Sequence, residues 1–209
     1  MLVRDIMTSP VLTISPDTTL QDAYRIMNER SIRHLPVLDA GVLVGVITDR
    51  DLRLATSVLT PTPFARQCRV SEVMCRSPLT ADPLDPVEDA ARTMRERKIG
   101  CLPVLEGGTV AGIITGIDLL DALMRMTGVD KPSGRLEVRM PDSPGALARL
   151  TAFMSDRNLN VHSILTYPDG SDRVRAVLRI GSIEVRPVAA ELRLTGFEVL
   201  WPPEKPWSR

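Results

Sequence analysis

The chain has 209 residues, which is enough for one large domain or two small ones. Its 26 Lys and Arg residues balance its 26 Asp and Glu residues, and no predominantly basic or acidic tract is present. This balance argues against a protein that binds nucleic acid or an anionic membrane through bulk charge. Aromatic residues, at 3%, are too few for a base-stacking platform. We therefore expect no nucleic acid and no membrane as partner.

The three cysteines, Cys68, Cys75 and Cys101, form no CxxC pair. The sequence therefore predicts neither a disulfide framework nor a four-ligand zinc site, and we expect no metal. The first residues are charged where a signal peptide needs an apolar run, and no window approaches the roughly 18 apolar residues of a spanning helix. These features favour a cytoplasmic protein.

An internal repeat dominates the first part of the chain, because residues 3–52 recur at 70–119 with an offset of 67. Gapless alignment of 32–52 with 99–119 gives 11 identities in 21 positions. Both copies also open with Val-x-x-h-Met, where h is apolar. Two copies are too few for a solenoid, so the repeat predicts a pseudo-twofold pair of α/β-type modules whose sheets bury each other.

Each copy predicts the order strand, helix, strand, strand, helix. A short extended piece, at 11–14 or 79–81, precedes an amphipathic helix that starts after Pro16 or Pro83. An LPVL strand, a Gly-containing turn and a second strand follow. The last strand runs directly into a helix that begins near Asp49 or Gly116.

The remaining segment is not a third copy. It predicts a strand at 135–140, a helix over 142–158 with Pro144 near its first position, and strands at 161–167 and 173–180. A short helix within 183–196 and a strand at 197–201 complete a βαββαβ, ferredoxin-like order. The fold class is thus α+β, and its alternating strands leave one sheet face free to pair. We expect modules at 1–59 and 70–127, linkers at 60–69 and 128–134, the ferredoxin-like domain at 135–201 and a tail at 202–209.

The motif T-x-x-D ends the last strand of each copy, at Thr48 to Asp51 and at Thr115 to Asp118. A strand that opens a helix presents unpaired N–H groups and a positive dipole end, which favour phosphate. The Asp could accept hydrogen bonds from a ribose diol. The same spacing is also a variant of the capping box, in which Thr and Asp only cap the helix. The sequence leaves both interpretations open.

The motifs of residues 3–122 resemble a tandem pair of CBS domains: Val-x-x-h-Met, h-x-x-LPV and G-h-h-T-x-x-D all occur twice. The resemblance implies binding of adenosine compounds in the cleft between modules, with Thr near phosphate, Asp near ribose, and adenine enclosed by backbone near the first strand and the LPV segment. AMP, ADP or ATP is the implied regulatory ligand, with S-adenosylmethionine or NAD as alternatives and no catalytic cofactor. The residues carried over are Thr48 and Asp51 in one site and Thr115 and Asp118 in the other, with Thr13, Ile14, His34 and Pro36 or Ala81, Cys101 and Pro103 nearby.

The two motifs differ in charge. Arg50 and Arg53 border Asp51, whereas the equivalent positions in the second copy are Ile117 and Leu120. Arginine forks suit phosphate oxygens. This comparison predicts that the Thr48/Asp51 site prefers the more phosphorylated ligand, unless the two arginines only form solvated surface pairs.

The C-terminal segment resembles an ACT domain through RLEVRMPDSPGALARLT and the following NLNVHSI. The resemblance implies a binding site for an amino acid at the loop between the first strand and the helix. Residues at the start of the next strand, often from a neighbouring subunit, complete this site. The implied residues are Asp142, Ser143, Gly145 and Ala146, with Asn160 and Val161. Asp142 and Ser143 are also ordinary helix-capping residues, and many ACT domains only dimerise.

The leading hypothesis is a non-catalytic ligand sensor that passes a change of domain geometry to a protein partner or to a dimer interface. Both resemblances imply a homodimer, through the CBS modules, the ACT sheet or both. The combination of two CBS modules and an ACT domain resembles bacterial acetoin-utilisation accessory proteins. Two alternatives stay open: a structural dimerisation adaptor with unoccupied clefts, and an enzyme that acts on nucleotides. No GxxxxGK[ST], HExxH or GxSxG motif supports the enzyme.

Overall fold

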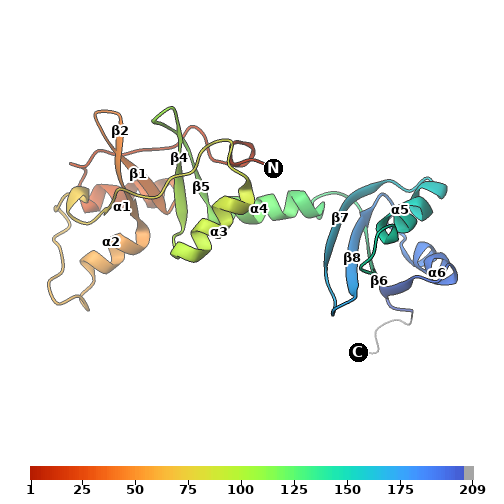
Figure 1. Cartoon of the computed structure of the whole chain (residues 1–209). Helices are drawn as coiled ribbons and strands as arrows, with labels where there is room; N and C mark the ends of the chain where they lie inside the picture. The colour runs from red at the N-terminus through yellow and green to blue at the C-terminus, as the bar shows by residue number, and fades with distance from the viewer. Residues whose placement is uncertain (205–209) are drawn as a thin grey trace. The chain divides into compact units, whose positions relative to one another are not determined.

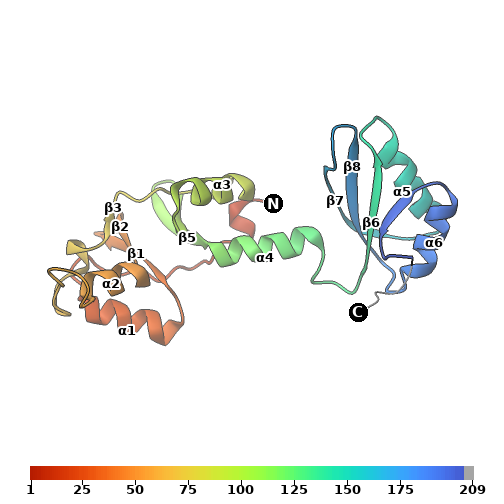
Figure 2. The ribbon, with the colours of Figure 1, turned by 90° about the horizontal axis from the view of Figure 1, so that it is seen from below.

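The computed structural model describes residues 1–204, which divide into two compact units. The first unit, Met1–Ala122, contains both copies of the repeat, and the second begins at Leu123. Both are shown in Figures 1 and 2. The α+β class predicted from the sequence is confirmed in both units.

The two copies of the repeat contain the same succession of elements. Those of the first copy are α1 (Leu20–Arg30), β1 (His34–Asp39), β2 (Val42–Thr48) and α2 (Asp49–Thr56). Those of the second copy are α3 (Val87–Arg97), β4 (Cys101–Glu106), β5 (Thr109–Thr115) and α4 (Gly116–Thr127). In each copy the two strands form an antiparallel hairpin with a bulge near its turn.

The extended pieces that precede α1 and α3 are shorter than the predicted strands. Each contributes one isolated parallel bridge, Ile14 to Val37 and Ala81 to Val104. Pairing stops after Ile14 because the chain turns at once, with the Thr18 N–H donating to the Ser15 carbonyl (3.1 Å). The first strand of each predicted module is therefore only a point of contact with the hairpin.

The opening segment of each copy packs into the core of the other copy. The first, a 3-10 turn at Val3–Asp5, packs into the second copy, where Val3 is fully buried against Leu102 and Ile114. The second, at Val70–Glu72, is buried in the core of the first copy. Both figures accordingly place the N-terminus beside the second copy. Module boundaries drawn from the repeat alone therefore do not coincide with the two hydrophobic cores.

Two glycines make this exchange sterically feasible. A Cβ on Gly112 would lie 2.8 Å from the carbonyl oxygen of Thr8, and one on Gly45 would lie 3.0 Å from that of Cys75. Beside Gly112, Thr8 and Ile113 exchange backbone hydrogen bonds of 2.9 and 3.1 Å. In the first copy β3 (Cys75–Arg76) pairs with β2 in the equivalent way. The glycine of G-h-h-T-x-x-D thus makes room for the opening segment of the other copy.

The two hairpins bury each other, as the repeat predicts. Val46 of β2, Cys101 of β4 and Ile113 of β5 form one buried cluster, with Val11 packed against it. This cluster lies between the strands that end in the two T-x-x-D motifs. Its burial fixes the two motifs relative to each other.

The second unit has the predicted βαββαβ order. Its elements are β6 (Gly134–Pro141), α5 (Ala146–Asp156), β7 (Val161–Pro168), β8 (Arg173–Ile180), α6 (Arg186–Leu194) and β9 (Glu198–Trp201). The strands form an antiparallel sheet in the order β7-β8-β6-β9. Helices α5 and α6 cover one face, where Leu136, Val138 and Met140 of β6 enter the core.

Helix α5 begins later than the sequence predicts. We expected it from 142 with Pro144 near its first position, but it starts at Ala146. Gly145, with φ +85°, takes the capping position in a left-handed conformation that ends the preceding turn. Pro144 therefore belongs to the turn between β6 and α5, together with Asp142 and Ser143.

The sheet face opposite the helices carries a hydrogen-bonded charge network. Glu137 of β6 is only 8% exposed and accepts hydrogen bonds from the Tyr167 hydroxyl (2.8 Å), Arg135 (2.7 Å) and Arg175 (3.3 Å). Burial alone would raise the pKa of the Glu137 carboxyl, but these donors hold that pKa below its ordinary value. This face is therefore polar near its centre rather than an apolar surface.

The exchange predicts that Gly112→Ala destabilises the first unit. Its methyl group would meet the Thr8 carbonyl and the Met7 sulfur, each 2.8 Å from the added carbon, and backbone must move to relieve the contact. We expect a loss of about 1–3 kcal/mol in the free energy of unfolding, measured in urea.

The matched control is Gly116→Ala, because nothing lies within 4 Å of a Cβ at Gly116. This control should leave stability unchanged or slightly raised, since alanine favours helix. Equal behaviour of the two variants would contradict the close approach of the exchanged segment.

Candidate functional site

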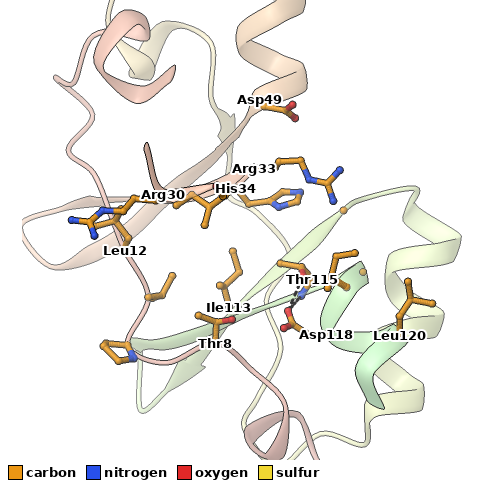
Figure 3. Close-up of a pocket in the computed structure, with 17 residues that line it drawn as sticks. Thr8, Leu12, Arg30, Arg33, His34, Asp49, Ile113, Thr115, Asp118 and Leu120 are labelled. Carbon is orange, nitrogen blue, oxygen red and sulfur yellow. Dashed lines mark hydrogen bonds between the residues drawn. The ribbon is translucent and has the colours of Figure 1, made fainter. Parts of the chain in front are cut away.

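Among the cavities of the first unit, one lies beside each T-x-x-D motif. The larger, about 1100 Å³, includes Thr115 and Asp118 in its wall and is drawn in Figure 3. The smaller, about 870 Å³, includes Thr48 and Asp51. Both volumes are of the size that small-molecule sites have.

Each cavity is built from both copies. The larger combines the motif of the second copy with Arg30, Arg33 and His34 of the first. Figure 3 shows Arg33 and His34 on the opposite side of the cavity from Thr115 and Asp118. The smaller combines the motif of the first copy with residues of the second, namely Cys75, Leu79, Lys98 and Cys101. The repeat explains this symmetry, because residues offset by 67 occupy equivalent walls.

The T-x-x-D residues cap their helices. Asp51 Oδ2 accepts hydrogen bonds from the Thr48 N–H (2.9 Å) and the Thr48 hydroxyl (2.7 Å). The Asp51 N–H in turn donates to Thr48 Oγ1 (3.2 Å), which completes a capping box. In the second copy Asp118 Oδ2 accepts from the Thr115 N–H and hydroxyl, both at 2.7 Å.

Capping uses only one oxygen of each carboxylate. Among residues 1–204, no hydrogen bond is made to Asp51 Oδ1 or Asp118 Oδ1. Both carboxylates are half-buried and belong to cavity walls. Each motif therefore holds a helix start rigid and still offers one fixed anionic acceptor to a ligand.

Four cations line the cavities without an ion-pair partner in the described part of the chain. Arg30 and Arg33 belong to the larger cavity, and Arg50 and Lys98 to the smaller. Arg53, which the sequence comparison counted with Arg50, instead pairs with Asp49 at 3.3 Å and does not line the smaller cavity. Arg53 therefore forms a surface ion pair, which was the alternative to phosphate binding, whereas Arg50 forms none within residues 1–204 and lines the smaller cavity.

Five of the residues carried over from the CBS resemblance line neither cavity: Thr13, Ile14, Pro36, Ala81 and Pro103. Ile14 and Ala81 are buried, and their N–H groups donate to the carbonyls of Pro36 (3.1 Å) and Pro103 (3.0 Å). They and their partners hold the extended pieces against the hairpins. Thr13 is likewise absent from both cavity walls, next to Ile14 in the same piece.

The two equivalent residues His34 and Cys101 differ in chemistry. Burial raises the pKa of the Cys101 thiol to about 12, so this thiol stays neutral near pH 7. His34 is half-buried and lines both cavities. Its pKa is lowered by burial and by Arg33, against the opposing effect of nearby carboxylates.

The candidate ligand residues of the second unit do not come together within one chain. Asp142, Ser143 and Gly145 follow the end of β6, where Pro141 pairs with Arg173 at the start of β8. Val161 pairs with Ile180 at the other end of β8. The loop residues through Ala146 and the pair Asn160 and Val161 thus lie at opposite ends of the sheet.

Among residues 1–204, no cluster of three or more His, Cys, Asp or Glu side chains could hold a metal ion. No described helix has both the length and the apolar character needed to cross a bilayer.

Family models match both units, and curated relatives match more than half of the chain. The CBS domain model matches residues 3–57 and 70–125, and the ACT domain model matches residues 134–193. A CBS domain-containing protein of Dictyostelium discoideum is 41% identical over 138 residues, 60% of this chain and 92% of that protein. One of Bacillus subtilis is 37% identical over 117 residues, 56% of this chain and 81% of that protein.

Solved structures match the first unit with TM-scores of 0.54. A CBS domain pair in complex with 5′-methylthioadenosine and S-adenosyl-L-methionine is 30% identical, covering 63% of this chain and 98% of that one. CBSX2 in complex with AMP is 29% identical, covering 60% and 97%. A Vibrio cholerae protein assigned to acetoin utilization is 32% identical, covering 62% and 95%.

The capping geometry predicts a stability loss for Thr48→Ala in the absence of ligand. The substitution removes the hydroxyl that Asp51 N–H and Asp51 Oδ2 both bind. We expect the free energy of unfolding to fall by about 0.5–2 kcal/mol, measured in urea on ligand-stripped protein.

Asp51→Asn is the matched control, since its amide oxygen can replace Oδ2 as acceptor of both hydrogen bonds. It should retain most of the stability. A Thr48→Ala protein as stable as the parent would show that the capping box is not formed in solution.

Proposed function

Because the chain belongs to the CBS domain family and carries a C-terminal ACT domain, we propose that it is a regulatory sensor that binds adenosine compounds without transforming them. The observation that carries the proposal is that Oδ1 of Asp51 and of Asp118 has no hydrogen bond within residues 1–204, while Oδ2 of the same carboxylate is held by the motif threonine in the wall of a cavity. Because each aspartate belongs to a cavity wall, its second oxygen is an acceptor that a ligand in the cavity can use.

The walls supply one group for each part of an adenosine ligand. Oδ1 can accept hydrogen bonds from the ribose diol, as acidic residues do in other nucleotide folds. The helix start and the unpaired cations favour phosphate oxygens. Apolar side chains such as Leu12 and Ile113 in the larger cavity, and Val46 and Leu79 in the smaller, offer surface to adenine.

The solved relatives support this ligand class. One CBS pair of similar fold was crystallised with 5′-methylthioadenosine and S-adenosyl-L-methionine, and another with AMP. For this chain we propose AMP, ADP or ATP as the regulatory ligand, because each cavity contains two cations without partners in the described structure. S-adenosylmethionine and NAD share the adenosine group and are competitors to be tested.

For this chain we propose that the larger cavity, rather than the smaller, prefers the more phosphorylated ligand. The sequence comparison assigned it to the Thr48/Asp51 site because of Arg50 and Arg53, but Arg53 lies outside that cavity. The larger cavity has two arginines from the other copy, whereas the smaller has one arginine and one lysine. Guanidinium groups bind phosphate oxygens through two parallel hydrogen bonds, which ammonium groups do not.

Signalling requires that each ligand favour one arrangement of the chain over another. We propose that occupation of the cavities alters the packing of the two copies, and that a dimer or a protein partner reads this change. For the ACT domain we propose an amino-acid site completed by a second copy, because one sheet places its two halves at opposite ends.

The adaptor alternative is tested by thermal stability. A ligand present at a hundred times its dissociation constant adds about 2.7 kcal/mol of stability, whereas an adaptor with empty clefts gains none from any adenosine compound. The enzyme alternative is tested by incubating purified protein with nucleotides and measuring turnover.

Two separate cavities predict a stoichiometry of two adenosine ligands per chain by calorimetry. Asp51→Asn and Asp118→Asn should each reduce this number to one, because each keeps its cap and loses one ribose acceptor. A stoichiometry that neither substitution changes would contradict the assignment of these carboxylates.

Cys75 provides a second readout of the smaller cavity. Its thiol is exposed in that wall, and its equivalent in the larger cavity is Thr8. AMP should protect Cys75 from alkylation in the parent protein and in Asp118→Asn, but not in Asp51→Asn. Cys68 lines neither cavity and serves as the internal control.

The arginine distribution predicts which site prefers ATP to AMP. The ratio of ATP to AMP affinity should be about tenfold higher in Asp51→Asn, which keeps the larger cavity, than in Asp118→Asn. Arg30→Ala should remove this difference, and Arg53→Ala should not. Equal ratios in the two single-site variants, measured by calorimetry, would contradict the assignment.

A further inference from the structure

One imidazole lies in the walls of both cavities. His34 is shared by the Thr115/Asp118 cavity and the Thr48/Asp51 cavity, together with Asp49 and Gly100. A Cβ on Gly100 would lie 2.7 Å from His34 Nε2, so the glycine leaves room for the ring. The two sites are therefore neighbours that meet at His34.

The ring is available to a ligand. No hydrogen bond joins either ring nitrogen to another of residues 1–204, and the residue is half-buried. The repeat provides no counterpart, because the equivalent residue is the neutral thiol Cys101. Two cavities thus have one imidazole between them.

The charges around this ring come from three parts of the unit. Arg33 precedes it in the chain, Asp49 and Asp51 face it from the start of α2, and Asp118 faces it from the start of α4. The cavities that it lines also contain Arg30, Arg50 and Lys98.

We propose that His34 is a phosphate contact common to both sites, so that a phosphorylated ligand in either cavity draws a proton onto the same ring. The inference rests on the proposed function, and it concerns how the two sites communicate. A negative phosphate near the ring stabilises the imidazolium, which donates through both nitrogens, whereas the neutral ring donates through one.

The sign of the pH dependence follows from the two states. In the ligand-free protein the pKa of His34 lies below its ordinary value of 6.5 because of burial. A bound phosphate raises this pKa, so binding takes up a proton between the two values. Affinity for a phosphorylated ligand should therefore rise as pH falls through that interval, and His34 should contribute no pH dependence above it.

Sharing has a consequence that separate titratable groups would not produce. The first phosphate to bind protonates the ring, and the second finds it already protonated. Saturation of both sites should then take up at most one proton per chain through this ring. The two bindings are coupled, because each changes the charge of a group that the other contacts.

The test is calorimetry of AMP binding to the full, ligand-stripped chain between pH 6 and 8, in buffers of different ionisation enthalpy. The variation of heat with buffer gives the protons taken up. We expect uptake in the parent protein, and in His34→Gln only the contribution of the phosphate itself. The affinity of His34→Gln should be about tenfold weaker at pH 6 and unchanged at pH 8.

His162→Gln is the matched control, since His162 is the only other histidine and lies in the second unit. It should behave as the parent. His34→Cys places the residue of the second copy at this position and provides a second variant should glutamine disturb folding. Adenosine, which has no phosphate, should bind the parent protein without proton uptake.

The single-site variants decide whether the ring is shared. Asp51→Asn and Asp118→Asn should each show uptake that depends on His34, and their sum should exceed the uptake of the parent at saturation. Uptake in only one of them, or uptake unaffected by His34→Gln, overturns the inference while the binding sites stand. Absence of any binding heat from AMP and adenosine overturns the proposed function, and this inference with it.

Discussion

The exchange of the two opening segments is the constraint on which the rest of the first unit depends. Each copy lacks part of its own core until the other copy supplies it, through Val3 in one direction and Val70 in the other. The close approach at Gly45 and Gly112 brings these segments against the strands that end in T-x-x-D. Both cavities are consequently composite, and neither copy could form one alone.

Capping and ligand binding are compatible functions of T-x-x-D rather than alternatives. One carboxylate oxygen accepts the hydrogen bonds at the helix start, which fixes the rotamer of the aspartate. The other oxygen accepts none within residues 1–204. A side chain held in this way loses little conformational entropy when a ligand binds. The structural role of Asp51 and Asp118 therefore prepares the acceptor that the proposed function uses.

The sequence was sufficient to predict the secondary structure, which depends on local pattern. It was insufficient to predict which residues of the two copies lie in the same cavity. Periodicity and the 67-residue offset predicted the helices, the hairpins and the βαββαβ segment. They did not show that Arg30 and Arg33 line the same cavity as Asp118, because these residues are distant in sequence and belong to the other copy. Arg53 differs for a local reason: it pairs with Asp49 one helical turn away, whereas its other neighbour Asp51 lines the cavity.

The two units differ in what one chain can complete by itself. In the first, both halves of each cavity are present because the repeat supplies them in one polypeptide. In the second, the loop after β6 and the start of β7 lie at opposite ends of strand β8. A ligand that needs both must therefore bind between two chains. The proposed adenosine response would then be a property of the single chain, whereas the proposed amino-acid response would depend on association and so on protein concentration.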